Sequence, residues 1–189
     1  MRIVGGRLKG RVLSAPASRA IRPTSERLRE SIFDILEHRF PGHIEGARVV
    51  DLFAGTGALA IEALSRGARF ALFVDNGADA RALLRANVEA LALGGVTRIW
   101  RADATKLAAA PAGGPFDLAF LDPPYGQGLA SPALAAARGE AAAEAQALGN
   151  PGEGEDQRDD EDEGTEEAPI HIVHHGAVSL CGLRSAARR

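Results

Sequence analysis

The residues with the clearest chemical potential are Asp122, Pro123, Pro124 and Tyr125, which follow an apolar run. Two adjacent prolines cannot continue a central strand, because neither has an N–H group to donate. Each proline ring also fixes its own φ angle, so the loop is stiff. The loop therefore holds a carboxylate and an aromatic ring rigidly at the end of a strand. An ordinary loop rarely needs this combination, and it indicates a binding or catalytic site.

A second candidate site lies where a buried strand turns into a helix. The stretch Arg48 to Leu64 reads RVVDLFAGTGALAIEAL, which predicts a strand, a glycine turn and a helix. Ligands of open α/β sheets bind at the carboxyl ends of strands, where Asp51, Gly55 and Gly57 would lie. The spacing Gly55-x-Gly57-x-x-Ala60 also fits a dinucleotide fingerprint, and a tight turn without a ligand would look the same. This stretch alone does not choose the ligand.

Three more strands are predicted, and each ends in residues that could serve a site at the same edge of the sheet. They are Phe70–Val74 followed by Asp75, Val96–Trp100 followed by Asp103 and Ala104, and Phe116–Leu121 followed by Asp122. An acid in the place of Asp75 commonly accepts hydrogen bonds from ribose hydroxyls in nucleotide sites. A solvated strand end is the alternative for Asp75.

Two helices besides the one after the glycine turn are expected to cover the sheet. The first starts at Pro23–Ser25 and ends before Pro41 and Gly42, and the second spans Arg81–Leu93. Their predicted inward residues are Leu28, Ile32, Ile35 and Leu36 in the first, and Leu83, Leu84, Val88 and Leu91 in the second.

Composition excludes several classes of protein. The chain has 189 residues, of which 46% are hydrophobic, and this is enough for one domain with a core. Cys181 is its only cysteine, so neither a disulfide framework nor a cysteine metal cluster can form within one chain. No apolar run reaches membrane-spanning length, and we expect a cytoplasmic protein with no membrane contact.

The net charge of −3 is unevenly distributed along the chain. Basic residues dominate the front of the sequence, Met1–Arg29, and acidic residues dominate Glu153–Glu167 near its end. A dense basic segment often meets a polyanion, so we expect the front to bind nucleic acid rather than to be an ordinary solvated arm. Its candidate contacts are Arg2, Arg7, Lys9, Arg11, Arg22 and Arg27. We expect a basic arm or hairpin over residues 1–22, a catalytic domain over 23–148 and an acidic, disordered tail over 149–189.

Taken together, the motifs resemble those of S-adenosylmethionine-dependent amino-methyltransferases. The motifs are Asp51-x-Phe53-x-Gly55-x-Gly57, Asp75, Asp103-Ala104 and Asp122-Pro123-Pro124-Tyr125. The front is more specific and is similar to the RsmD family. It carries Arg2-Ile3-Val4-Gly5-Gly6, Gly10-Arg11, Arg22-Pro23-Thr24 and Arg29-Glu30-Ser31-Ile32-Phe33. The resemblance runs from Met1 to about Gly128.

The resemblance implies a Rossmann-like fold with a mostly parallel sheet, and methylation of the exocyclic N2 of a guanine in 16S (small-subunit) ribosomal RNA. It implies that S-adenosyl-L-methionine binds at Asp51, Phe53, Gly55, Gly57, Asp75, Asp103 and Ala104, and that the base binds at Asp122 to Tyr125. No metal is needed. The implied partner is ribosomal RNA or the assembling small ribosomal subunit, and we expect a monomer.

Three alternatives stay open. The same tetrapeptide type also serves amino groups in DNA or a glutamine amide, which would change the substrate and keep the reaction. A nicotinamide-dependent oxidoreductase would explain the glycine turn but would leave Asp122 to Tyr125 without a purpose. A catalytically damaged RNA-binding protein would bind RNA without methyl transfer.

The resemblance fails after about Gly128. Leu129–Leu148 is rich in alanine and predicted to be helical after Pro132, and Gly149–Ala168 is acidic and polar. Ile170–Leu180 predicts at most one short apolar segment, so we expect the sheet to be incomplete at its C-terminal strands. His171, His174 and His175 in that segment lack the acidic or cysteine neighbours of a metal site. A divergent tail, or a reading frame shifted near 132–139, would account for this change.

Overall fold

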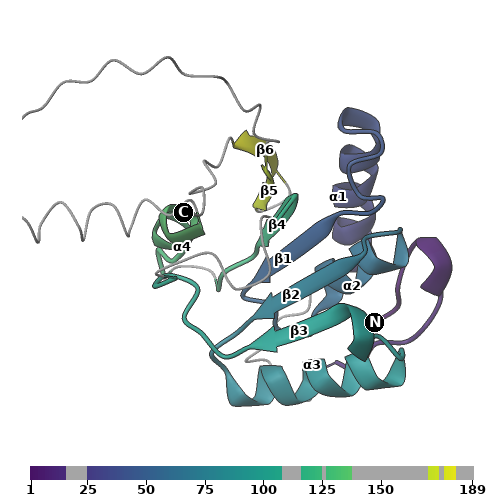
Figure 1. Cartoon of the computed structure of the whole chain (residues 1–189), viewed down its shortest axis with the longest axis horizontal. Helices are drawn as coiled ribbons and strands as arrows, with labels where there is room; N and C mark the ends of the chain where they lie inside the picture. The colour runs from purple at the N-terminus through teal and green to yellow at the C-terminus, as the bar shows by residue number, and fades with distance from the viewer. Residues whose placement is uncertain (16–24, 108–115, 125–126, 138–169, 175–176, 182–189) are drawn as a thin grey trace, which may run out of the picture.

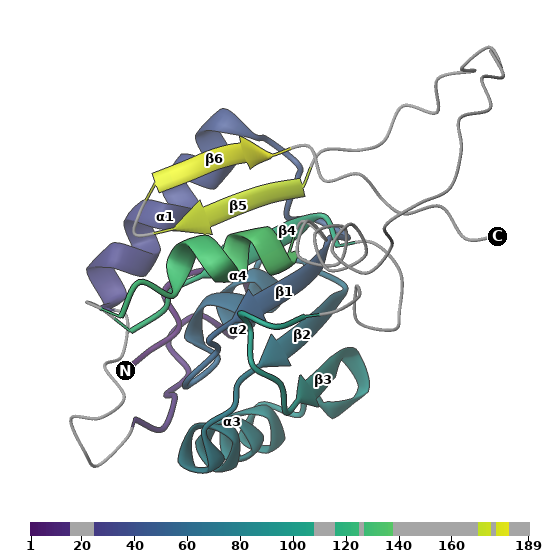
Figure 2. The ribbon, with the colours of Figure 1, turned by 90° about the vertical axis from the view of Figure 1, so that its left-hand side faces the viewer.

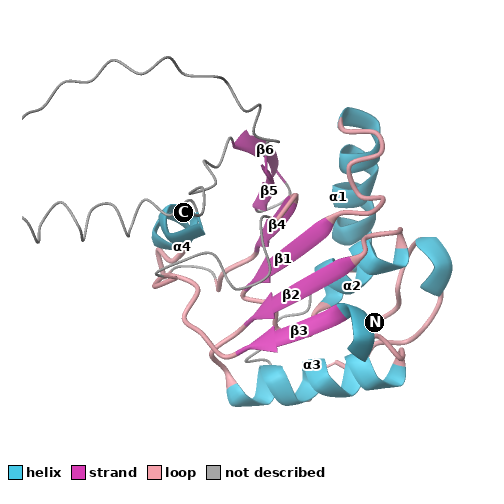
Figure 3. Cartoon of the chain, in the orientation of Figure 1, coloured by secondary structure: helices cyan, strands magenta, loops and turns pink. Residues whose placement is uncertain are grey.

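The fold is built on one six-stranded sheet with helices on both faces (Figures 1 and 3). The computed structural model describes residues 1–15, 25–107, 116–124, 127–137, 170–174 and 177–181. The strands are β1 (Arg48–Leu52), β2 (Phe70–Val74), β3 (Thr97–Trp100), β4 (Leu118–Leu121), β5 (Ile170–His174) and β6 (Ala177–Cys181). Their order across the sheet is β3-β2-β1-β4-β5-β6. All neighbouring strands run parallel except β5 and β6, which are antiparallel.

The apolar residues of the strands alternate between two cores. On one face, Val49, Phe73 and Phe120 pack with α1 (Glu26–Arg39), α2 (Ala58–Ser65) and α3 (Ala78–Ala90). On the other face, Val50, Leu52, Leu72, Val74 and Leu121 pack with α4 (Ala130–Ala137). Because successive side chains of a strand point to opposite faces, a strand that is buried on both sides must be apolar nearly throughout. This explains the continuous apolar runs of the sequence.

Most predicted elements are confirmed, with shifted ends. Ser25 caps α1, its hydroxyl oxygen accepting the Leu28 N–H at 3.2 Å. Two predicted inward residues of α1 lie less deeply than expected, since Leu28 is 37% exposed and Ile35 is half-buried. Helix α3 begins three residues before the predicted start, and α4 begins at Ala130 rather than after Pro132. A proline is tolerated in a first helical turn, because the N–H that it lacks would have no partner within the helix.

The tail contributes two strands where the sequence predicts at most one short apolar segment. Strand β5 pairs with β4 in parallel, from Leu118 with His171 to Leu121 with His174, and β6 pairs with β5. Figure 2 shows both strands beside α1, which contacts β6. An unpaired edge of β4 would leave a row of peptide groups without hydrogen bonds, and β5 supplies those partners. None of the helices in the described ranges has the length and apolar character of a membrane span.

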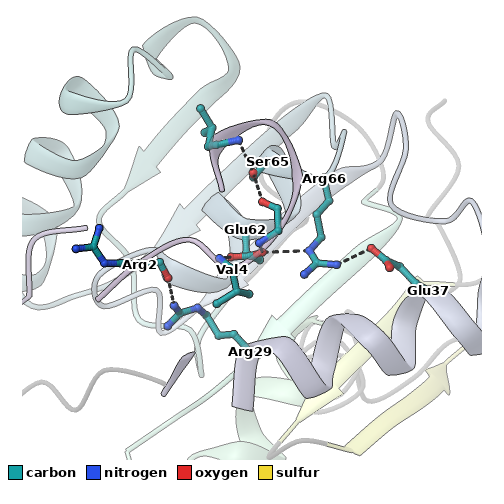
Figure 4. Close-up of polar contacts among 9 residues, drawn as sticks. Arg2, Val4, Arg29, Glu37, Glu62, Ser65 and Arg66 are labelled. Atoms are coloured by element: carbon teal, nitrogen blue, oxygen red, sulfur yellow. Dashed lines mark hydrogen bonds and ion pairs between the residues drawn. The ribbon is translucent and has the colours of Figure 1, made fainter. Parts of the chain in front are cut away.

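The N-terminal segment folds back on itself and docks on α2. A single antiparallel bridge joins Arg2 to Val12, and η1 (Gly6–Leu8) forms the bend of this short hairpin, whereas residues 16–22 of the predicted arm or hairpin lie outside the described residues. The buried Glu62 carboxylate accepts the N–H groups of Val4 and Gly5 at 2.9 and 2.6 Å (Figure 4). The Ser65 hydroxyl donates to the Gly5 carbonyl at 2.6 Å and accepts from the Leu8 N–H at 2.9 Å.

Gly6 permits this docking for a steric reason. Its φ is +69°, and a Cβ there would lie 2.0 Å from the Ser65 carbonyl oxygen. Gly10 also has a positive φ, +83°, but a Cβ there would meet no atom within 4 Å. The two glycines therefore separate backbone strain from steric conflict.

We expect Gly6→Ala to be much more destabilising than Gly10→Ala. Gly10→Ala, the control, should lower the free energy of unfolding by about 1–2 kcal/mol because of its positive φ alone. Gly6→Ala should lower it by at least about 2 kcal/mol more, because the hairpin must move off α2. Urea unfolding of both variants measures the difference. Equal losses would contradict the close packing of Gly6 against Ser65.

Candidate functional site

Three of the predicted site residues, Asp51, Asp75 and Asp122, lie at or after strand ends where the order of the strands reverses. The chain proceeds outward from β1 to β2 and β3, and then returns to β4 on the other side of β1. In open α/β sheets, ligands bind beside such a switch point, at the carboxyl ends of the strands. Leu52 pairs with Val74 on one side and with Leu121 on the other. The residues that follow these three, among them Asp75 and Asp122, therefore leave the sheet at one level.

Asp51 is a buried carboxylate beneath this edge. Only 2% of the residue is exposed, and its Oδ2 accepts the Ala60 N–H at a long 3.4 Å. The pKa of Asp51 is raised to about 7, mainly by burial and in smaller part by the negative charges of Asp122 and Asp75, while the Ala60 hydrogen bond opposes the rise. The electrostatic coupling of these three acids is the clearest sign that their strand ends face one region.

Backbone and side-chain hydrogen bonds hold the glycine turn after β1. Phe53 has a φ of +72°, which is unusual for an aromatic residue, and its N–H donates to the Val74 carbonyl at 3.0 Å. The Gly55 N–H donates to Asp75 Oδ2 at 2.9 Å. At Gly57 a Cβ would lie 2.3 Å from Leu84 Cδ1. Gly57 also has a φ of +78°, so glycine at this position avoids backbone strain and leaves room for Leu84 of α3.

Asp75 and Asp103 both hold local backbone groups. Asp75 Oδ1 accepts the Gly77 N–H at 2.7 Å, in addition to the Gly55 bond of Oδ2. Asp103 Oδ1 accepts both the N–H and the hydroxyl of Thr105, and these bonds lower the pKa of Asp103. Each carboxylate oxygen has two lone pairs, so both side chains retain capacity to accept bonds from a ligand. Ala104 is buried in the core on the α4 face.

The loop after β4 is described in part. Asp122 is half-buried, Pro123 is buried and Pro124 is exposed. Tyr125, the predicted aromatic member of the loop, lies outside the described residues. Among the described residues, no group of three or more His, Cys, Asp or Glu side chains could hold a metal ion.

The predicted RNA-binding side chains are exposed wherever they are described. Arg2, Arg7, Lys9 and Arg11 are exposed on the hairpin, and Arg27 is exposed on α1. The Arg2 and Arg11 guanidinium groups donate to the Gly10 and Ala90 carbonyls, both at 3.1 Å. Arg22 lies outside the described residues.

Sequence reasoning missed three buried polar residues that support the site. They are Arg29, Glu62 and Asn87, and each is at most 1% exposed. Arg29 donates to the Arg2 carbonyl oxygen, and Glu62 also accepts from Arg66 Nε at 3.1 Å, while Arg66 pairs with Glu37 at 2.6 Å (Figure 4). The available signal was Glu62 itself, a lone acid in a helix that is otherwise apolar apart from its final Ser65.

Comparison with known proteins decides the family. The family described as Conserved hypothetical protein 95, which is the RsmD family, matches residues 1–148. The chain belongs to this family. Membership in the RsmD family confirms the resemblance and extends it beyond Gly128, across the whole of α4. The strands β5 and β6 lie outside the matched region.

Individual relatives agree with the RsmD family assignment. The chain is 42% identical over 127 residues to the putative rRNA methyltransferase YlbH of Bacillus subtilis, covering 66% of this chain and 67% of that protein. It is 37% identical over 129 residues to ribosomal RNA small subunit methyltransferase D of Escherichia coli K12, covering 68% and 62% respectively. The match thus spans about two thirds, or slightly less, of the length of these relatives.

The structural comparison confirms the expected fold. The putative methyltransferase yhhF from Escherichia coli superimposes with a TM-score of 0.60 at 34% identity, covering 71% of this chain and 69% of that one. The fold is therefore the Rossmann-like fold of methyltransferases, as the RsmD family resemblance implies.

The raised pKa of Asp51 makes a prediction about stability. An acid whose pKa is higher in the folded state than in the unfolded state destabilises the fold increasingly as pH rises between the two values. We expect Asp51→Asn to unfold at nearly the wild-type urea concentration at pH 4, and to be more stable by a few kcal/mol at pH 8. The asparagine oxygen can still accept the Ala60 N–H.

The exposed Asp34 on α1 provides a matched control. We expect Asp34→Asn to change stability by less than about 0.5 kcal/mol at both pH values, as surface substitutions usually do. A constant difference between Asp51→Asn and wild type across this pH range would contradict the assignment of the raised pKa.

Proposed function

We propose that this chain is an S-adenosyl-L-methionine-dependent methyltransferase that acts on the exocyclic N2 amino group of a guanine in 16S ribosomal RNA. The observation that carries the proposal is the convergence of Asp51, Asp75 and Asp122 at the strand-order reversal, in a chain of the RsmD family. Relatives named as ribosomal RNA small subunit methyltransferases support the class of substrate.

The donor set fits S-adenosyl-L-methionine. This molecule presents hydrogen-bond donors at its ammonium group, its ribose hydroxyls and its adenine amino group. Three acceptors of the chain would meet these donors: Asp51 beside the glycine turn, Asp75 after β2 and Asp103 after β3. When bound, the molecule supplies an electrophilic methyl group on a positively charged sulfur. Buried negative charge beside the site favours such a cation.

The same charges argue against the nicotinamide alternative. A dinucleotide would place an anionic pyrophosphate at the glycine turn, where the start of α2 would attract it. The buried Asp51, with Asp75 and Asp122 close enough to raise its pKa, would repel it. A buried carboxylate at a pyrophosphate site would therefore oppose binding, whereas it favours a sulfonium ligand.

The loop after β4 supplies the groups that a poor nucleophile needs. The lone pair of a guanine amino group is delocalised into the ring, so the nitrogen attacks weakly. The Asp122 carboxylate and the Pro123 carbonyl can each accept one of its N–H groups, which draws the nitrogen toward sp³ geometry and aims its lone pair. Tyr125 would stack on the base and fix its plane. Fixed alignment of two reactants is itself a large catalytic contribution.

The target base must also be accessible. An amino group inside a paired duplex cannot reach the loop, so the base would be unpaired or flipped. The exposed arginines and lysine of the hairpin would bind the RNA backbone, since such contacts position a nucleic acid without reading its sequence.

We expect Asp122→Ala and Asp75→Ala to fail in different ways. Asp122→Ala should lower kcat roughly 100-fold while changing the Kd for S-adenosyl-L-methionine less than about threefold, because the proposed role of Asp122 is to contact the base and not the methyl donor. Asp75→Ala should raise that Kd about tenfold or more, because it loses the ribose contacts and frees the Gly55 N–H. Isothermal titration and radiolabelled methyl transfer to small-subunit ribosomal particles measure the two effects.

Parallel assays separate the competing functions. Binding of NAD without binding of S-adenosyl-L-methionine would reject the proposal in favour of an oxidoreductase. Label transferred to duplex DNA but not to ribosomal particles would reject the RNA substrate. RNA binding without any methyl transfer by the wild-type chain would identify a catalytically damaged protein.

We expect the simultaneous changes Arg7→Ala, Lys9→Ala and Arg11→Ala to weaken RNA binding and flatten its dependence on salt. Each lost phosphate contact should reduce the slope of log K against log salt by about one. A matched control with the same loss of charge replaces the exposed Arg39, Arg69 and Arg98 by alanine. Equal salt slopes in the two triple variants would place the RNA footprint away from the hairpin.

A further inference from the structure

Asn87 joins three parts of the molecule that are far apart in sequence. It lies on α3 and is 1% exposed. Its Oδ1 accepts the Ser14 N–H at 2.8 Å, and its Nδ2 donates to the Ser14 carbonyl at 3.3 Å. The same Nδ2 donates to the Thr56 carbonyl at 3.0 Å. One amide therefore binds the end of the N-terminal segment and the middle of the glycine turn.

The three bonds use the donors of this side chain completely. An amide has two N–H groups, and here each goes to a different carbonyl, while its oxygen takes the Ser14 N–H. Aspartate could not donate to either carbonyl, and glutamine would place the amide one methylene further out. The requirement for two donors and one acceptor at this depth selects asparagine.

The orientation of the Thr56 carbonyl determines the geometry of the turn. This carbonyl belongs to the peptide between Thr56 and Gly57, whose N–H donates to the Ala54 carbonyl at 2.7 Å. Holding the carbonyl therefore fixes the plane of that peptide and with it the closed turn. One helical turn earlier on α3, Leu84 fills the space beside Gly57 where a Cβ would lie. Helix α3 thus supports the turn by one apolar and one polar contact.

We propose that Asn87 is a positioning residue, which locks the Gly55–Gly57 turn to the docked N-terminal segment and so sets the geometry that the methyl donor meets. The part of this inference that concerns the donor rests on the proposed function. The part that concerns the turn does not, because the hydrogen bonds are present in the chain alone.

Amide hydrogen exchange tests the turn without any ligand. In Asn87→Ala we expect the Gly57 N–H to exchange at least tenfold faster than in wild type, because the peptide plane is no longer held. Val88→Ala, which removes buried apolar contacts from the next position of α3, is the matched control for general destabilisation. It should leave the exchange of Gly57 within about twofold of wild type.

Titration with S-adenosyl-L-methionine tests the consequence for binding. We expect Asn87→Ala to raise the Kd about tenfold, and Val88→Ala and Ser14→Ala to leave it unchanged. Ser14 is bound through its backbone, so losing its hydroxyl removes neither of its bonds to Asn87. If Asn87→Ala does not fold, Asn87→Gln replaces it, since this variant keeps a neutral amide but places its donors one methylene away from the Ser14 and Thr56 carbonyls.

The outcomes separate this inference from the proposed function. Failure of the wild-type chain to bind the donor would reject the proposed function and leave the exchange experiment valid. A folded Asn87 variant with wild-type exchange at Gly57 would overturn the inference, and so would a wild-type Kd in a chain that does bind the donor.

Discussion

The parallel pairing of β1 with β2 on one side and β4 on the other is the constraint on which the candidate site depends. Parallel strands end at the same edge, so segments remote in sequence deliver their following residues to one place. Asp51, Asp75 and Asp122 come from three different strand ends, and the charges of the other two raise the pKa of the buried Asp51. No single segment of the chain could bring these three negative charges together. Their convergence is a product of strand order.

A second layer of polar contacts holds the N-terminal segment against this framework. Burying the Glu62 carboxylate is costly unless its oxygens are bonded, and they accept two backbone N–H groups and the Arg66 guanidinium. Asn87 does the same for Ser14 and the glycine turn with a neutral side chain. The basic hairpin therefore packs on the helices that also support the turn, so under the proposed function the RNA-binding surface and the donor-binding loop would be held by the same helices.

Local periodicity predicted the elements because each strand is buried on both faces and reads as an apolar run. The predicted strand Phe70–Val74 matches β2 at both ends. The inward faces were harder to predict. Arg29 reads as a surface arginine and Asn87 as an ordinary helix residue, because their partners Arg2, Ser14 and Thr56 are distant in sequence. The two strands of the tail were not predicted for a similar reason: β5 is a strand because it pairs with β4, which is distant in sequence. The convergence of the acids could be predicted from the topology, but the burial of Asp51 could not.

Under the proposed function, the energetically unfavourable burial of Asp51 would help the site to bind a cationic ligand. The pKa near 7 means that ionising the buried Asp51 carboxylate costs free energy. A cationic ligand placed beside the carboxylate would reduce that cost. Transfer of the methyl group turns a positive sulfonium into a neutral thioether, so the same carboxylates would attract the product less than the reactant. The acidic edge would then contribute to selecting the ligand and to releasing the product. A neutral residue at position 51 would make the fold more stable and the site less discriminating, which is the trade-off expected where function requires an unfavourably buried charge.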